Sequence, residues 1–326
     1  LNMKKILITG ADGFVGSHFV ETLLKKNYDI YATVQYNSLN NWGWLEKIKN
    51  NKVKIFCGDL RDKNFCQRVT KVDCIVNFAA LIAIPYSYEN FEQYIDTNVK
   101  GTFNLCDAAL KNKVKKFIQI STSEIYGTAD YVPIDEQHPK KPQSPYSASK
   151  IASDAIAKSY YYSYNLPVVI ARPFNIYGPR QSGRAIIPTI ITQVLKNNSH
   201  VKLGKITPTR DFTYVSDTCE IIERIIKSKK SIGQEINIGS GKEISIKDLD
   251  KKILQIMKVR FKIKSNNTNR LRPKKSEVER LICNNKKMIN ILNVKPKISL
   301  EEGLKLTLKW FKDEENLKQY KNIYTK

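Results

Sequence analysis

The stretch Lys4-Lys-Ile-Leu-Ile-Thr-Gly10-Ala-Asp-Gly13-Phe-Val-Gly16-Ser-His-Phe-Val20 decides the fold of this chain. A short apolar run ends at Gly10, and apolar residues with helical spacing begin at Phe14. This order predicts a strand, a tight turn and a helix. In such a unit Gly10 supplies the turn, Gly13 lets the backbone approach a pyrophosphate, and Gly16 lets the helix pack closely on the sheet. The N-terminus of the helix then faces the anion.

The pattern of strand, turn and helix repeats along the first half of the chain. Strand-like runs alternate with helical patterns, and they lie at residues 6–8, 30–34, 53–57, 74–78, 117–121 and 168–172. Such alternation predicts an α/β fold of the Rossmann type, a doubly wound parallel sheet covered on both faces. After Gly178 the elements become short and mixed. We therefore expect a dinucleotide-binding domain over residues 1–178 and a smaller α/β substrate-binding lobe over 179–326, with a segment near 235–240 returning to the main sheet.

A second informative region combines the runs Ser121-Thr-Ser-Glu124 and Ser144-Pro-Tyr-Ser-Ala-Ser-Lys150. Tyr146 and Lys150 stand one helical turn apart, so an ammonium close to the phenol is expected to favour the phenolate. A tyrosine activated in this way can take a proton from a hydroxyl while hydride leaves for a nicotinamide. Glu124 directly follows a predicted strand, and the carboxyl ends of parallel strands meet at one edge of a sheet. These residues and the glycine turn together predict a redox site.

Composition limits the alternatives. The chain has 326 residues and a net charge of +24, but its lysines are spread along the whole sequence, which indicates a solvated surface and no nucleic-acid partner. The six cysteines form no CxxC pair and fall mostly in apolar patterns, as reduced core residues of a cytoplasmic protein do. The three histidines are isolated, so we expect no metal site. A long apolar run and a signal-like N-terminus are both missing from the sequence, so no membrane partner is expected.

Seven motifs follow one another in the order that is typical of a single family. They are Gly10-Ala-Asp-Gly-Phe-Val-Gly16, Gly58-Asp-Leu-Arg-Asp62, Asn77-Phe-Ala-Ala80, Ser121-Thr-Ser-Glu-Ile-Tyr-Gly127, Tyr146 to Lys150, Arg172-Pro-Phe-Asn-Ile-Tyr-Gly-Pro-Arg180 and Arg210-Asp-Phe-Thr-Tyr-Val215. With them the chain resembles, over nearly its whole length, an extended short-chain dehydrogenase/reductase acting on a nucleotide sugar. Residues 80–88, 35–43 and 276–280 are most similar to the NAD-dependent 4,6-dehydratases of the legionaminic-acid pathway, which act on nucleotide-linked N-acetylglucosamine, GDP-linked in some members.

The resemblance implies a mechanism. Thr122 would hydrogen-bond the 4-hydroxyl of the sugar, and Tyr146 would remove its proton as carbon 4 gives up hydride, with Lys150 beside it. Glu124 would then abstract the proton at carbon 5, and Ser123 or a bound water would relay a proton to the hydroxyl that leaves carbon 6. The hydride finally returns to carbon 6, which gives a 4-keto-6-deoxy sugar nucleotide.

The resemblance also implies two sets of binding residues. The set expected to hold the cofactor is Gly10, Asp12, Gly13, Phe14, Val15, Gly16, Gln35, Asp59, Leu60, Ala79, Ala80, Leu81, Asn98, Ser121, Tyr146, Lys150 and Pro173. The set expected to hold the substrate is Tyr86, Thr122, Asn175, Arg184, Gly204, Arg210 and Arg272. It further implies a homodimer formed by the helix near Tyr146 and a helix over about Glu92 to Lys111.

Two departures from the family pattern leave choices open. The second strand ends in Gln35, where NAD-specific folds usually carry an acidic residue for the ribose, but no arginine stands there for a 2′-phosphate. NAD is therefore favoured and NADP stays open. Many sugar dehydratases place Asp before the catalytic Glu, whereas this chain has Ser123. The resulting Thr-Ser-Glu resembles both the relatives that dehydrate GDP-mannose and the UDP-glucuronate decarboxylases, so the triplet alone does not separate the two.

The alternatives are accordingly such a decarboxylase, a nucleotide-sugar 4-epimerase, or a regulator that senses the cofactor. An epimerase needs no carboxylate at Glu124, and a regulator would not need the complete set of reactive side chains. The sequence leaves the nucleobase and the 2-substituent of the sugar open.

Overall fold

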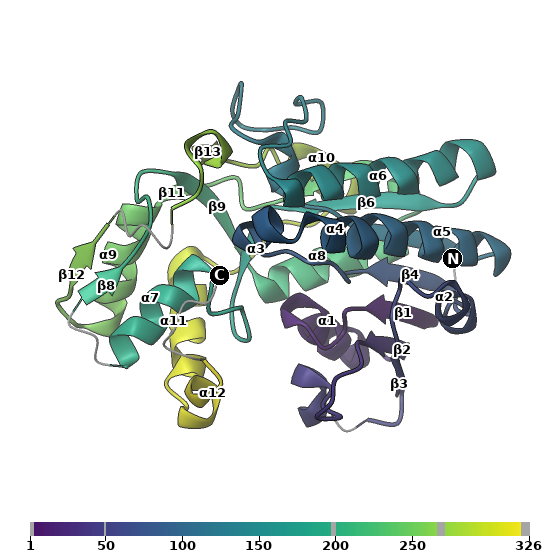
Figure 1. The fold of residues 1–326 in the computed structure, drawn as a ribbon, viewed down its shortest axis with the longest axis horizontal. Coiled ribbons are helices and arrows are strands. Elements are labelled where there is room, and N and C mark those ends of the chain that lie inside the picture. Colours follow the sequence, from purple (N-terminus) through teal and green to yellow (C-terminus); the bar gives the residue numbers. More distant parts are fainter. Residues whose placement is uncertain (1–2, 49, 197–199, 266–270, 321–326) are drawn as a thin grey trace.

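A seven-stranded sheet forms the centre of the computed structural model, which describes residues 3–48, 50–196, 200–265 and 271–320 (Figure 1). Its strands pair in parallel in the order β10-β6-β5-β4-β1-β2-β3. Their bounds are Lys5–Thr9 (β1), Asp29–Val34 (β2), Val53–Cys57 (β3), Cys74–Asn77 (β4), Lys116–Ile120 (β5), Val168–Pro173 (β6) and Glu235–Ile238 (β10). The order reverses between β1 and β4, and ligands of such sheets bind outside the carboxyl ends of the strands at this point. The predicted Rossmann-type fold is confirmed.

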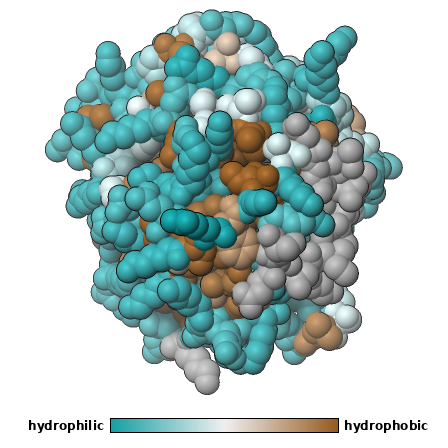
Figure 2. All heavy atoms as spheres, turned by 90° about the vertical axis from the view of Figure 1, so that its left-hand side faces the viewer, coloured by the Kyte–Doolittle hydropathy of each residue, from teal (hydrophilic) through white to brown (hydrophobic). Residues whose placement is uncertain are grey.

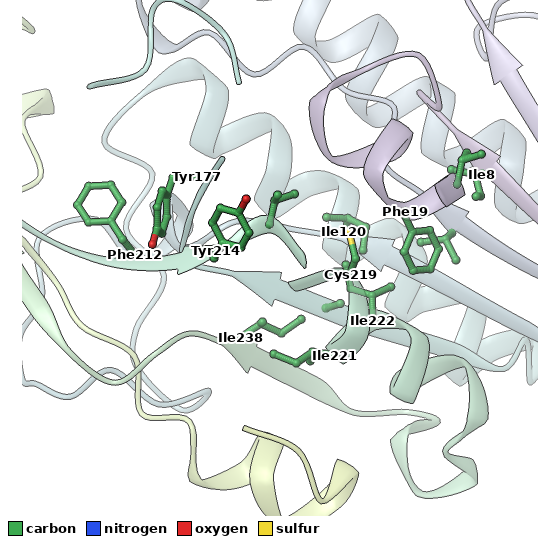
Figure 3. Close-up of a cluster of buried hydrophobic side chains, with 14 of the residues drawn as sticks. Ile8, Phe19, Ile120, Tyr177, Phe212, Tyr214, Cys219, Ile221, Ile222 and Ile238 are labelled. Carbon is green, nitrogen blue, oxygen red and sulfur yellow. The ribbon is translucent and has the colours of Figure 1, made fainter. Parts of the chain in front are cut away.

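Helices cover both faces of the sheet. On one face α1 (Phe14–Lys25) packs against α8 (Val215–Lys227), and Phe19 of α1 lies near Cys219 and Ile222 of α8 (Figure 3). The other face carries α2 (Lys63–Val69), α5 (Gly101–Lys111) and α6 (Pro145–Tyr164). Strands buried on both faces are mainly apolar, with Lys116 in β5 and Arg172 in β6 as charged exceptions, which explains why the sequence marks them as apolar runs.

The segment expected as one helix over about Glu92 to Lys111 is composite. It comprises α4 (Phe91–Tyr94), the π-helical segment η2 (Ile95–Lys100) and α5. The widened turn carries Asn98, whose side chain bonds both backbone groups of Leu81 and the hydroxyl of Ser149. π-Helical turns are frequent at functional sites, and here the turn ties the segment after β4 to α6.

The second half of the chain builds a smaller part beside the sheet. Its elements are β7 (Asn175–Tyr177), α7 (Ile186–Leu195), β8 (His200–Lys202), β9 (Thr209–Tyr214), β11 (Glu243–Ser245), α9 (Ile246–Met257), β12 (Lys262–Lys264), η6 (Lys274–Ser276), β13 (Arg280–Leu281), α10 (Lys286–Leu292), α11 (Leu300–Phe311) and α12 (Glu314–Lys318). Strands β7, β11 and β13 pair with β9, and β8 pairs with β12. The segment expected near 235–240 forms β10, which lies beside β6, and α8 also packs on the main sheet.

One hydrophobic core runs from the sheet into the smaller part. It begins around Ile8 and Phe19 and continues to Tyr177 and Tyr214, whose ring centroids are 5.5 Å apart (Figure 3). On the outside, Figure 2 shows hydrophilic side chains over most of the end face of the smaller part, with a limited hydrophobic area near its centre. None of the helices that the structure describes is long and apolar enough to cross a membrane.

The short elements that shape the candidate site lie near the carboxyl edge of the sheet. They are η1 (Gly43–Lys47) after β2, α3 (Ile84–Glu89) after β4 and η3 (Ser123–Tyr126) after β5. A further short helix, η4 (Lys229–Ser231), precedes β10. At the opposite edge of the sheet, Lys116 at the start of β5 holds the end of α8. Its buried ammonium donates hydrogen bonds to the carbonyls of Ile225, Ile226 and Ser228. An ammonium at the C-terminus of a helix satisfies carbonyls that the helix leaves without partners.

Candidate active site

The turn between β1 and α1 has the geometry of a phosphate cradle. Gly10 has a φ of +61°, and a Cβ there would lie 3.0 Å from the Cα of Ala79. A Cβ on Gly16 would lie 2.2 Å from the carbonyl oxygen of Gly10, so the helix could not pack on the turn with any larger residue. Gly13 precedes α1 and provides no side-chain cap. The first amides of α1 can therefore point at an anion, and this cradle fits the pyrophosphate of a dinucleotide.

The segment after β4 is fixed next to this cradle by side-chain hydrogen bonds. The hydroxyl of Thr9 donates to Asn77 at 2.6 Å and accepts from the amide of Ala79 at 3.1 Å. The amide of Leu81 donates to Asn98 at 2.8 Å. Ala79, Ala80 and Leu81 thus line the edge of the sheet at the reversal point, as expected, and Asn98 acts on them by positioning the backbone.

The residues expected around the adenosine half lie at the ends of β2 and β3. Gln35 is exposed directly after β2, and Leu60 is buried after β3. The carboxylate of Asp59 is held by Arg61 at 2.6 Å, and this hydrogen bond lowers the pKa of Asp59. Asp12, inside the glycine turn, has a raised pKa because it is partly buried. The charge of Asp59 is therefore balanced by Arg61 at the edge of the sheet where we expect the cofactor.

The reactive side chains expected from the sequence lie together where β5 meets α6. Thr122 caps η3, and its hydroxyl accepts the amide of Glu124 at 3.2 Å. The side chain of Tyr146 hydrogen-bonds that of Thr122. Lys150, one turn further along α6, donates to the carbonyl of Ile120 at 2.7 Å. Ser123 is buried in the same short helix.

The expected effect of Lys150 on Tyr146 is not seen in this structure. Burial raises the pKa of Tyr146 above its ordinary value, and the hydrogen bond with Thr122 only partly offsets this. Burial also lowers the pKa of Lys150 to about 8, although the nearby Asp154 acts in the opposite direction. Desolvation outweighs the attraction that helical spacing predicts, since both groups are buried.

Two arginines approach Glu124 from the second half of the chain. Arg272 forms an ion pair with Glu124 at 3.5 Å, and their side chains are 24% and 14% exposed. Burial lowers the pKa of Arg210. The negative charge of Glu124 raises this pKa and the positive charge of Arg272 lowers it, so both charged groups lie close to Arg210. Arg210 also pairs with Glu277 at 3.8 Å. We expect Arg272 to bind a substrate phosphate, whereas in this structure it pairs with the carboxylate of Glu124.

An aromatic wall stands beside the reactive tyrosine. The rings of Tyr94 and Tyr146 meet edge to face with centroids 6.3 Å apart, and Tyr86 lies 6.2 Å from Tyr94. The hydroxyl of Tyr88 bonds Ser276 at 2.6 Å. Burial raises the pKa of Tyr94 to about 12, and the exposed Arg184 is close enough to offset part of this rise. Apolar and phenolic groups therefore form this side of the site.

Three residues that we expected in the site lie at its margins. Pro173 ends β6, and Asn175 begins β7 with an amide oxygen that is buried without a hydrogen-bond partner among the described residues. Such an acceptor is available to a ligand hydroxyl. Gly204 lies between β8 and β9 in the smaller part.

Sequence reasoning missed a buried ionic network behind the site. Asp154 accepts a hydrogen bond from Ser121 at 2.6 Å and pairs with Arg172 at 3.2 Å. Arg172 also pairs with Glu235 at 2.7 Å, and Lys158 completes the network. Arg172, Lys158 and Lys140 hold the pKa of Glu235 at about 2 against the effect of burial.

A signal for this network is present in the sequence. Asp154 follows Tyr146 and Lys150 at the same four-residue spacing, and Arg172 interrupts a buried strand, where a charge needs partners. In the chain as described, His, Cys, Asp and Glu do not gather in threes that could hold a metal ion.

A dinucleotide cradle at the reversal point and a tyrosine, a lysine and a threonine at the carboxyl edge define a short-chain dehydrogenase/reductase type of site. The family model of GDP-mannose 4,6 dehydratase matches residues 7–307. The chain therefore belongs to the extended short-chain dehydrogenase/reductase family of nucleotide-sugar 4,6-dehydratases and epimerases.

Individual relatives show the same two activities. The human dTDP-D-glucose 4,6-dehydratase is 32% identical over 98% of this chain and 93% of its own. A dTDP-glucose 4,6-dehydratase from Streptomyces venezuelae, solved with NAD, has a TM-score of 0.86, 28% identity and coverage of 95% and 97%. A UDP-glucuronic acid 4-epimerase from Bacillus cereus, solved with UDP-glucuronic acid and NAD, has a TM-score of 0.87, 28% identity and coverage of 95% and 99%.

Proposed function

We propose that this chain is an NAD-dependent nucleotide-sugar 4,6-dehydratase. The observation that carries the proposal is the position of Glu124, which lies close enough to Tyr146 to affect its pKa and whose amide bonds Thr122, the residue that caps η3. A 4-epimerase acts at carbon 4 alone and needs no second base. A dehydratase must also remove a proton at carbon 5. The carboxylates of Glu124 and Asp154 both act on the pKa of Tyr146. We assign the proton removal to Glu124, because Asp154 is buried and bonded to Ser121 and Arg172.

The chain's own residues account for the proton steps of this reaction. Thr122 and Tyr146 hold the 4-hydroxyl between them, and Tyr146 takes its proton. Burial keeps the pKa of the phenol high in this structure, so we assign to Lys150, one helical turn away, the stabilisation of the negative charge that develops on the phenol during the reaction. Glu124 removes the proton at carbon 5, which the 4-ketone makes acidic, and returns a proton to carbon 5 when hydride reaches carbon 6. Ser123, or a water held beside it, passes a proton to the leaving hydroxyl.

The cofactor of this reaction is NAD. A bound NAD would supply the hydride acceptor for carbon 4 and the hydride donor for carbon 6. The cradle at Gly10, Gly13 and Gly16 supports this assignment, and so does the presence of NAD in the solved relatives from Streptomyces venezuelae and Bacillus cereus. Gln35 can bond ribose hydroxyls through its amide, and it carries no cation for a 2′-phosphate.

The substrate is a nucleoside diphosphate sugar, and Arg210 and Arg272 are the groups for its diphosphate. Guanidinium groups match phosphate oxygens in pairs, and Arg272 lies close enough to Arg210 to lower its pKa. The residues at 80–88 favour GDP-N-acetylglucosamine. The names of the relatives favour dTDP-glucose instead, so both sugars belong in the first assay.

A homodimer is part of the proposal. Large apolar side chains are exposed along α4, η2, α5 and α6, which lie side by side along one edge of the molecule in Figure 1. They include Phe91, Ile95, Phe103 and Tyr162, which are between 41% and 68% exposed. A two-fold axis that brings these helices against a second copy would bury them in a four-helix bundle.

The test of the proposed function uses purified protein with GDP-N-acetylglucosamine, dTDP-glucose and UDP-glucuronate in separate reactions. Mass spectrometry distinguishes loss of one water molecule from an unchanged mass and from loss of carbon dioxide. We expect loss of water from one of the first two sugars. An unchanged mass with an inverted 4-hydroxyl would identify an epimerase, and loss of carbon dioxide from UDP-glucuronate would identify a decarboxylase.

A further inference from the structure

The short helix η1 lies directly on the phosphate turn. The backbone amide of Trp44 donates to the carbonyl oxygen of Asp12 at 3.3 Å. Gly43 precedes it with a φ of +56°, and a Cβ at that position would lie 3.0 Å from the same oxygen. Asp12 stands between Gly10 and Gly13, so any movement of η1 acts on the turn that would hold the pyrophosphate.

The side chain of Trp44 reaches the smaller part of the molecule. Its ring meets that of Trp310 in α11 with centroids 5.5 Å apart and an interplanar angle of 66°. α11 packs against α9, α7 and β9, away from the sheet, and Figure 1 shows α1 and α11 in different parts of the molecule. Trp310 is itself held edge-on by Phe311 at 4.9 Å and by Tyr320 at 6.1 Å. Trp44 thus connects the phosphate turn with α11 in the smaller part of the molecule.

A separate set of polar contacts holds α1 in place without Trp44. Arg180 pairs with Glu21 at 2.6 Å, and His18 bonds the carbonyl of Pro179 at 3.0 Å. The apolar packing of α1 against α8 adds to them. Loss of the Trp44 ring should therefore loosen the cover of the turn while the two parts of the molecule stay together.

We propose that Trp44 and Trp310 form a latch that keeps η1 closed over the phosphate turn and makes departure of the dinucleotide slow. The inference rests on the proposed function, because a reaction that returns its hydride to the product regenerates the cofactor in place. Such an enzyme gains from retaining the cofactor through many turnovers. η1 can move away from the phosphate turn only when the backbone contact between Trp44 and Asp12 breaks, and the ring contact with Trp310 opposes that movement.

The test measures the release of reduced cofactor. Protein loaded with NADH is mixed with excess NAD, and the loss of bound NADH fluorescence gives the dissociation rate. We expect Trp44→Leu to accelerate release about two- to tenfold, which is the range that one aromatic pair contributes. Trp44→Phe should lie near the wild-type rate because it keeps an aromatic ring. Trp42→Leu is the matched control, since Trp42 lies two residues away in the same segment and is 38% exposed.

A double-mutant cycle distinguishes a latch from a general loosening. If the two rings act through one contact, Trp44→Leu combined with Trp310→Leu releases NADH no faster than the faster single variant. Unchanged release from Trp44→Leu, equal acceleration by Trp42→Leu, or multiplied rates in the double variant would each overturn the proposal. If Trp44→Leu does not fold, the NADH dissociation rates of Trp310→Leu and of the control Trp42→Leu are compared instead. No sugar nucleotide enters this experiment, so its outcome is independent of whether the chain dehydrates a sugar.

Discussion

Replacing Glu124 by glutamine should separate the two halves of the proposed reaction. The substitution keeps the shape of the side chain and removes its ability to take a proton. Oxidation at carbon 4 uses Tyr146 and Thr122, which the substitution leaves in place. Removal of the proton at carbon 5 then has no base. We expect bound reduced cofactor to accumulate while 6-deoxy product falls by at least about 10², the lower end of what general acid–base catalysis contributes.

The same substitution has a structural cost that can be calculated from the ion pair. Glu124 and Arg272 are 3.5 Å apart and partly exposed, at 14% and 24%. We expect the free energy of unfolding to fall by about 1–2 kcal/mol, between the ~0–1 kcal/mol of an exposed pair and the ~3–5 kcal/mol of a broken buried pair. This loss is small enough for the variant to fold, so the kinetic result can be interpreted.

Glu277→Gln is the matched control for this experiment. Glu277 has the same 14% exposure as Glu124 and pairs with the other arginine, Arg210, at 3.8 Å. It should lose a similar amount of stability and still produce the 6-deoxy sugar. Absorbance of reduced nicotinamide in stopped flow, mass spectrometry of the product and thermal unfolding provide the three readouts. Normal dehydration by Glu124→Gln, with deuterium entering carbon 5 from heavy water at the wild-type rate, would show that another residue is the base.

Three further predictions concern the tyrosine, the dimer and pH. Tyr146→Phe should leave cofactor binding intact and reduce oxidation at carbon 4 by at least about 10² in single turnover; wild-type turnover would refute the assignment. Phe103→Glu on α5 should convert a dimer into a monomer in light scattering, and a wild-type monomer at micromolar concentration would already contradict the dimer. Burial and the charge of Arg180 lower the pKa of His18 from 6.5 to about 4, so the unfolded chain binds a proton that the folded chain does not. Stability should therefore fall as the pH drops from 6.5 to 4, by up to about 3 kcal/mol, and His18→Gln should remove this part of the dependence; an unchanged pH profile in that variant would exclude His18 as the cause.

Local sequence signals were sufficient to predict the main sheet. All six strands expected in the first half occur within about a residue of their predicted bounds, because buried parallel strands are apolar on both faces and end abruptly at glycine or polar residues. The π-helical turn around Asn98 was not predictable in this way, since a period of 3.6 residues carries no mark of one widened turn. The helix expected there was correct in extent and wrong in its regularity.

In the candidate site, too, local features were predictable from the sequence and contacts between distant segments were not. The four-residue spacing of Tyr146 and Lys150 indicated that they share one face of α6, but spacing carries no information about burial, which reverses the expected effect on the pKa of the tyrosine. The pairing of Arg272 with Glu124 and of Trp44 with Trp310 joins residues far apart in the sequence. Such contacts depend on how the second half of the chain folds back on the sheet, and no local pattern records it.

The most direct test of the central claim is one wild-type reaction in heavy water. The protein is incubated with NAD and, in separate reactions, GDP-N-acetylglucosamine or dTDP-glucose, and the product is examined by mass spectrometry and by proton NMR. The proposed function predicts loss of one water molecule, one deuterium at carbon 5, and no net consumption of NAD. A product of unchanged mass without deuterium at carbon 5 would contradict it and assign the chain to the epimerases of its family.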